Sequence, residues 1–89
     1  MHAVVVSVTI NDREAATDHL RTNVVPGVKQ APGLVAAYWV RIDGKGRSMG
    51  IFESEDAARA AADRLRETAD SSPGVTLNDV TVGEVVANA

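Results

Sequence analysis

The chain has 89 residues and a mass of 9.3 kDa, which suits one small domain spanning residues 1–89. The absence of cysteine excludes disulfide bridges, thiolate metal sites and cysteine nucleophiles. Twelve acidic and nine basic residues give a net charge of −3, the wrong sign for non-specific nucleic-acid binding. No apolar run reaches the roughly 20 residues of a membrane span, and the opening residues lack the features of a signal peptide. We therefore expect a cytoplasmic protein that binds neither nucleic acid nor a membrane.

The first half of the chain predicts a strand, a helix and a second strand. Branched residues dominate positions 3–10, which favours a pleated strand. Asn11 or Asp12 can cap the helix that follows, and Pro26 should kink this helix or begin a separate short turn. Pro-Gly at positions 32–33 ends the helical pattern, and the apolar run 34–42 predicts the second strand.

The second half repeats this order. Residues 43–46 are a strong reversal signal, and residues 47–52 return as a third strand. Ser54 can cap a second helix, rich in alanine, that runs to about residue 69. Residues 75–86 predict a fourth strand with a bulge near Gly83.

Strand, helix, strand, strand, helix, strand is the order of a split βαβ pair. It predicts an α+β, ferredoxin-like βαββαβ fold, with a four-stranded antiparallel sheet and two helices on one face. The strands at 3–10 and 34–40 are nevertheless apolar on both faces, and two helices cover only one. We therefore expect a homodimer, a dimeric α/β barrel, whose sheets pack face to face around Val, Ala and aromatic side chains.

With this order of elements, the chain resembles the dimeric α+β barrel superfamily, and within it the antibiotic-biosynthesis-monooxygenase-like domains. The likeness is carried by Val25–Val28 followed by Ala31–Leu34, and by Phe52–Ala57 at the end of the third strand, and it extends over essentially the whole chain. Members include cofactor-independent oxygenases of aromatic polyketides, haem-degrading enzymes and isomerases, so the resemblance leaves the activity open.

The haem-degrading branch fits this chain poorly. That branch has an Asn in the first strand, a Trp at the end of the third and a His in the second helix. Here the first strand offers Ser7 and Thr9, the third ends in Phe52, and no histidine follows His19. We expect neither a metal nor another cofactor.

Alternation along the second and third strands sorts their side chains onto two faces. In one register, with a four-residue loop at 43–46, Trp39 lies opposite Gly50, which then makes room for the indole; a two-residue loop is the alternative. One face takes Leu34, Ala36, Tyr38, Val40, Ile42, Met49 and Ile51, and the other takes Val35, Ala37, Trp39, Arg41, Ser48, Gly50 and Phe52.

His19 and Asn23 are four residues apart and share one flank of the first helix. His19 is the candidate general base, although a half-exposed helix flank explains it equally. The candidate ligand-binding residues are Asn23, Tyr38, Trp39, Arg41 and Phe52, each with an ordinary structural explanation as core, interface or solvated charge.

Three functions remain open. The first is a non-catalytic dimeric domain that binds a small apolar or aromatic ligand or another protein; the small residues of the second helix favour it, because they leave little cavity. The second is a cofactor-independent monooxygenase acting on a phenolic or quinone-type substrate, which requires a pocket that holds His19 and Trp39 together. The third is another activity of the superfamily, such as an isomerase or a lyase. The sequence does not decide whether the protein is an enzyme.

Overall fold

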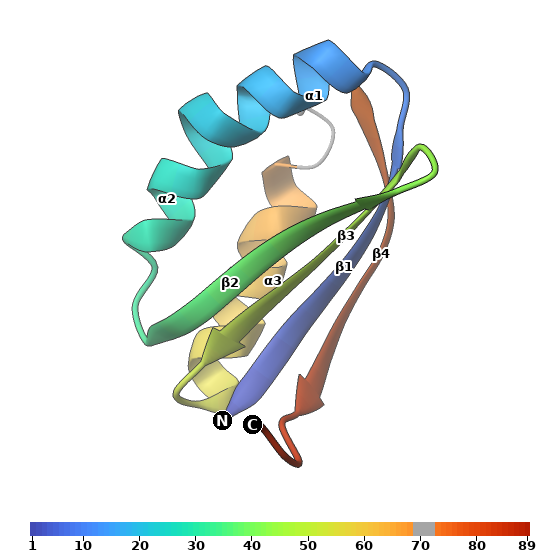
Figure 1. Cartoon of the computed structure of the whole chain (residues 1–89). Coiled ribbons are helices and arrows are strands. Elements are labelled where there is room, and N and C mark those ends of the chain that lie inside the picture. The colour runs from blue at the N-terminus through green and yellow to red at the C-terminus, as the bar shows by residue number, and fades with distance from the viewer. Residues whose placement is uncertain (69–72) are drawn as a thin grey trace.

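The fold consists of one four-stranded sheet with helices packed against it. The computed structural model describes residues 1–68 and 73–89 (Figure 1). Its strands are β1 (His2–Ile10), β2 (Leu34–Ile42), β3 (Lys45–Phe52) and β4 (Val75–Glu84), and its helical elements are α1 (Arg13–His19), the π-helical η1 (Leu20–Val24), α2 (Val25–Lys29) and α3 (Glu55–Thr68).

All pairings in the sheet are antiparallel, in the order β2-β3-β1-β4. The helices lie on one side of this sheet (Figure 1). The α+β, ferredoxin-like fold predicted from the order of elements is therefore confirmed. β1 and β3 occupy the centre, and β2 and β4 form the two edges.

The β2–β3 hairpin closes on two residues, so the four-residue-loop register is wrong. Ile42 pairs with Lys45, and Asp43 and Gly44 take positive φ of 47° and 78°, as a two-residue turn between twisted strands requires. Trp39 therefore lies opposite Ser48. A Cβ added to Gly50 would lie 3.1 Å from the ring of Phe52, so this glycine accommodates Phe52 rather than the indole.

Two bulges alter the expected faces. The β2–β3 register shifts between Leu34 and Ala36, so Leu34 packs against the core beneath the helices, although strict alternation placed it on the opposite face. In the β1–β4 pairing the register shifts opposite Ser7 and Val8, whose partners are Asp79 and Leu77. This bulge replaces the one predicted near Gly83.

α1, η1 and α2 form one continuous bent helix, here named the helical arc (residues 13–29; Figure 1). Asp12 caps it, because its Oδ1 accepts a hydrogen bond from the Ala15 N–H at 3.1 Å. The interruption predicted at Pro26 takes the form of the wide π turn directly before it. Proline has no N–H to donate, and its ring crowds the preceding turn.

The core lies under α3 rather than under the helical arc. Ala58 and Ala62 are fully buried against Val4, Val6 and Phe52, because small side chains let the helix approach the sheet closely. Ser54 caps this helix by accepting from the Ala57 N–H at 3.1 Å. The helical arc has no buried residue in any of its three parts, so it stands away from the sheet.

Candidate ligand-binding cavity

A cavity of about 660 Å³ lies between the helical arc and the sheet, within the range typical of small-molecule sites. Its floor is formed by small residues of β2 and β3: Ala37, Gly46, Ser48 and Gly50. These positions alternate along the two strands and face the helices together. The small residues of α3 led us to expect little cavity between the helices and the sheet. That expectation is wrong, because the cavity lies under the helical arc.

The walls of the cavity are mainly apolar. Leu20, Val24 and Val28 line it from the arc, and Leu65 lines it from α3. Trp39, the single tryptophan of the chain, lines it from β2 and is half-buried. Phe52 both lines the cavity and belongs to the core, with 3% of its surface exposed. Such walls favour an apolar or aromatic occupant.

His19 and Asn23 line the cavity as a hydrogen-bonded pair, with Asn23 Nδ2 3.1 Å from His19 Nδ1. When the amide N–H donates to Nδ1, a neutral imidazole carries its proton on Nε2 and is a donor there. A general base instead needs the amide oxygen to accept from Nδ1–H, which leaves the Nε2 lone pair free. The arrangement present therefore favours hydrogen bonding to a ligand oxygen.

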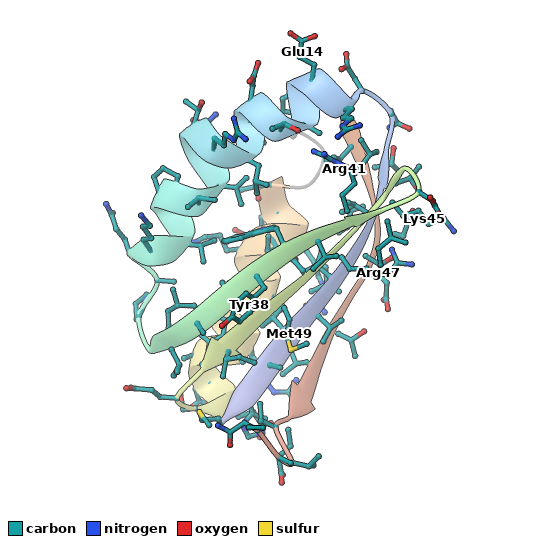
Figure 2. All side chains as sticks on the ribbon, viewed as in Figure 1. Glu14, Tyr38, Arg41, Lys45, Arg47 and Met49 are labelled. Carbon is teal, nitrogen blue, oxygen red and sulfur yellow. The ribbon has the colours of Figure 1, made fainter. Side chains whose placement is uncertain are left out.

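Arg41 connects the sheet to the helical arc. Its Nη2 donates to Thr17 Oγ1 at 2.6 Å, and Figure 2 shows its side chain reaching from β2 towards α1. The Thr17 hydroxyl in turn donates to the Arg13 carbonyl at 2.8 Å. Both Arg41 and Thr17 line the cavity, so the guanidinium group is held at its wall by a neutral partner.

Tyr38 lies on the other face of the sheet. It pairs with Met49 in the β2–β3 ladder. The next pair, Trp39 and Ser48, faces the helices, so alternation places Tyr38 and Met49 on the other face of the sheet. Tyr38 is 66% exposed, and Figure 2 shows its side chain beside β2 with Met49 nearby. The structure thus separates Tyr38 from the other aromatic candidates, Trp39 and Phe52.

Five polar residues that line the cavity were not among the sequence candidates: Thr17, Arg47, Ser48, Arg64 and Thr68. The charges of α3 alternate in sign along the sequence, which is typical of a solvated helix face and gives no sign that Arg64 reaches a cavity. Only the position of α3 over the sheet reveals that this one arginine reaches the cavity. Within residues 1–68 and 73–89, no three His, Asp or Glu side chains gather where they could hold a metal ion. In the part of the chain that the structure describes, no helix has the length and apolar character to cross a membrane.

The sequence matches no family model and no curated protein. Solved structures do share the fold. SnoaB, a cofactor-independent oxygenase from Streptomyces nogalater, is 14% identical with a TM-score of 0.73, over 98% of this chain and 94% of SnoaB. ActVA-Orf6, a monooxygenase from Streptomyces coelicolor solved with nanaomycin D, is 17% identical with a TM-score of 0.61, over 98% of this chain and 92% of that one.

A dimeric ferredoxin-like protein from an uncultured marine organism is 8% identical with a TM-score of 0.65, over 100% of this chain and 98% of that one. MupZ from Pseudomonas fluorescens is longer: this chain spans 65% of its length, with 91% of this chain covered, 10% identity and a TM-score of 0.70. The chain therefore shares its ferredoxin-like fold with these solved structures.

Proposed function

We propose that the protein binds a small aromatic molecule of phenolic or quinone type in the cavity beneath the helical arc. The carrying observation is the cavity itself, about 660 Å³ with an apolar lining. Polar groups occur at a few places on its wall, notably the His19–Asn23 pair and Arg41. An apolar interior with a small number of polar anchors is the usual design of a site for a small organic ligand.

Trp39 makes this binding directly measurable. It is the only tryptophan and it lines the cavity, and quinones quench indole fluorescence on contact. Titration with 2-methyl-1,4-naphthoquinone should quench the Trp39 emission in a saturable way. The chain has no cysteine that this quinone could alkylate. Quenching that rises linearly without saturation indicates collisions only and contradicts the proposal.

A cavity-filling substitution supplies the matched test. Ala37→Leu adds a large side chain to the cavity floor, and we expect it to weaken quinone affinity by about tenfold or more. Ala60→Leu makes the same change on the exposed side of α3 and should leave the affinity unchanged. Equal affinities in both variants contradict binding beneath the arc.

Cofactor-independent oxygenation is the second candidate, favoured by the presence of His19 and Trp39 in one cavity. SnoaB, which has this fold, is such an oxygenase. With 1-naphthol, His19 would take the phenolic proton, and ring carbon 4 would form a bond to O₂ and give a hydroperoxide. Loss of the C4 hydrogen with cleavage of the O–O bond then releases water and 1,4-naphthoquinone. One O₂ is consumed and no other reductant is needed.

An oxygen electrode tests this candidate. We expect one O₂ consumed for each quinone formed, and His19→Ala should lower the rate about 100-fold, as for the loss of a general base. The same variant should still bind quinone by the Trp39 assay. If phenols bind but no oxygen is consumed, the protein only binds its ligand and the oxygenase activity is excluded. A cytoplasmic location stays a prediction.

The same proposal includes a homodimer formed through the open face of the sheet. That face carries large exposed apolar side chains: Val5, Tyr38, Val40, Ile42 and Met49. An apolar patch of this kind on a small protein marks an interaction surface. A ferredoxin-like protein of the same fold is dimeric, which supports a second copy of this chain as the partner.

A further inference from the structure

The charges around the cavity are of one sign. Arginine and histidine side chains line it, and none of the acidic residues that the structure describes does. Eleven of the twelve Asp and Glu residues lie within the described ranges, and Asp70 lies outside them. In a chain with a net charge of −3, this segregation of positive charge is unexpected for a site that takes a neutral ligand.

Two of the three lining arginines face the cavity from opposite elements. Arg41 extends from β2 and Arg64 from α3, whereas Arg47 lies on the open face and donates to the Gly46 carbonyl at 3.1 Å. Arg41 has Thr17 as its hydrogen-bond partner and, within the described residues, no carboxylate in ion-pair range. Its remaining guanidinium N–H groups are therefore available.

The arginines of α3 show the same contrast. Arg59 pairs with Glu55 at 2.9 Å and Arg66 pairs with Asp63 at 3.1 Å. Arg64 lies between them in the sequence, and no described carboxylate pairs with it. It is also the only one of the three that lines the large cavity. Arg64 is exposed like the other two, but it is the one of these three that lines the cavity and has no described carboxylate partner.

We propose that the ligand is an aromatic carboxylate, whose carboxylate binds to Arg41 while Arg64 adds to the positive potential of the cavity. The planar guanidinium fork matches a carboxylate with two parallel hydrogen bonds. An ionised group inside apolar walls needs such a partner to offset its lost hydration. The inference rests on the proposed ligand-binding function and narrows its ligand class.

Matched ligands test the charge directly. 1-Hydroxy-2-naphthoate and 1-hydroxy-2-naphthamide share the ring and the phenol and differ in charge. By Trp39 fluorescence or calorimetry, we expect the acid to bind about tenfold more tightly than the amide. Equal affinities overturn the carboxylate inference and leave the ligand-binding function standing. Binding of neither compound overturns both.

Arginine variants then show which side chain binds the carboxylate of the ligand. Arg41→Met should weaken binding of the acid about tenfold and leave the amide unchanged, and Arg64→Met should weaken the acid a few-fold. Arg59→Met removes the same charge on the outer side of α3, away from the cavity lining, and should change neither ligand. Because the amide reports on folding and cavity shape in each variant, loss of both ligands in Arg41→Met contradicts the assignment of the carboxylate to Arg41. If the Arg41→Met variant still binds the acid more tightly than the amide by the wild-type factor, the assignment is contradicted as well.

Discussion

The imidazole of His19 has two possible chemical roles, and the side chain of Asn23 selects between them. An amide can present either its NH₂ or its oxygen to Nδ1. If the NH₂ donates to Nδ1, the imidazole proton lies on Nε2; if the oxygen accepts, the proton lies on Nδ1. An Asn23 Nδ2 group that donates to Nδ1 over the 3.1 Å contact requires the proton of the neutral ring to lie on Nε2. Binding chemistry then follows naturally, whereas base catalysis requires the amide to turn.

Asn23→Asp should reverse the tautomer, since a carboxylate can only accept and therefore retains the proton on Nδ1. Two-bond ¹H–¹⁵N spectra of the imidazole distinguish the two forms of the neutral ring. We expect Nε2–H in the wild type and Nδ1–H in the variant. Thr22→Asp introduces the same charge one residue earlier and should leave the tautomer as it is. His2→Gln identifies which signals belong to His19. An identical tautomer in Asn23→Asp and the wild type contradicts this account.

Which residues meet in the cavity was only partly predictable. The pairing of His19 with Asn23 follows from helical spacing, and the common face of Trp39 and Arg41 follows from alternation. The position of Leu34 did not follow, because a bulge at Val35 changes the face and leaves no signal in a uniformly apolar run. Arg64 was also missed, because its neighbours alternate in charge and the sequence does not say which side of α3 faces the sheet.

At the scale of the elements, hydrogen bonds hold the helical arc to the rest of the fold through its first part, α1. Near its start, the Gly74 carbonyl accepts from the Asn11 and Asp12 N–H groups at 2.7 and 3.1 Å. A Cβ on Gly74 would lie 2.6 Å from the Asp12 carbonyl oxygen, so only glycine allows this close approach. The Arg41–Thr17 hydrogen bond, also in α1, connects the arc to β2.

The two helix caps should therefore differ in their functional effect. Asp12→Ala and Ser54→Ala each remove one N-terminal cap, and each should lower the free energy of unfolding by about 1 kcal/mol. Urea denaturation measures this loss. Asp12→Ala should also weaken quinone quenching of Trp39, since fraying of the arc opens the cavity, whereas Ser54→Ala on the well-packed α3 should not. Equal effects of both variants on quenching contradict the contrast between the two helices.

At this scale most of the fold was predictable, because capping residues, Pro-Gly breaks and branched runs are local signals. The hairpin register was not, since Asp43–Gly46 is compatible with two loop lengths. The cavity was not either. Its floor depends on Ala37, Gly46 and Gly50 meeting across two strands, which is known only once the register is fixed.

At the scale of the whole molecule, the open face of the sheet is the surface proposed to meet a second copy of the chain. Val40 and Ile42 are 52% and 55% exposed on this face. Val40→Asp should produce a monomer or an aggregate in sedimentation, because a charge buried between two sheets is strongly unfavourable. Ala60→Asp, on the exposed side of α3, should leave the dimer intact.

The wild-type melting temperature should rise with protein concentration, as expected when dissociation accompanies unfolding. A stable 9.3 kDa monomer at micromolar concentration, with a melting temperature independent of concentration, contradicts the dimer.

The sheet is a single layer, and β2 serves both of its sides at once. Trp39 and Arg41 face the cavity, while Tyr38 and Val40, their immediate neighbours in the strand, face the open side. Any ligand that shifts β2 therefore also shifts the surface proposed to meet a second copy. Thermodynamic reciprocity then requires the coupling free energy to be the same in both directions. Each protomer has its own cavity, so a dimer would hold two ligands. The dimer dissociation constant with saturating ligand must therefore differ from that without ligand by the square of the factor by which ligand affinity differs between monomer and dimer.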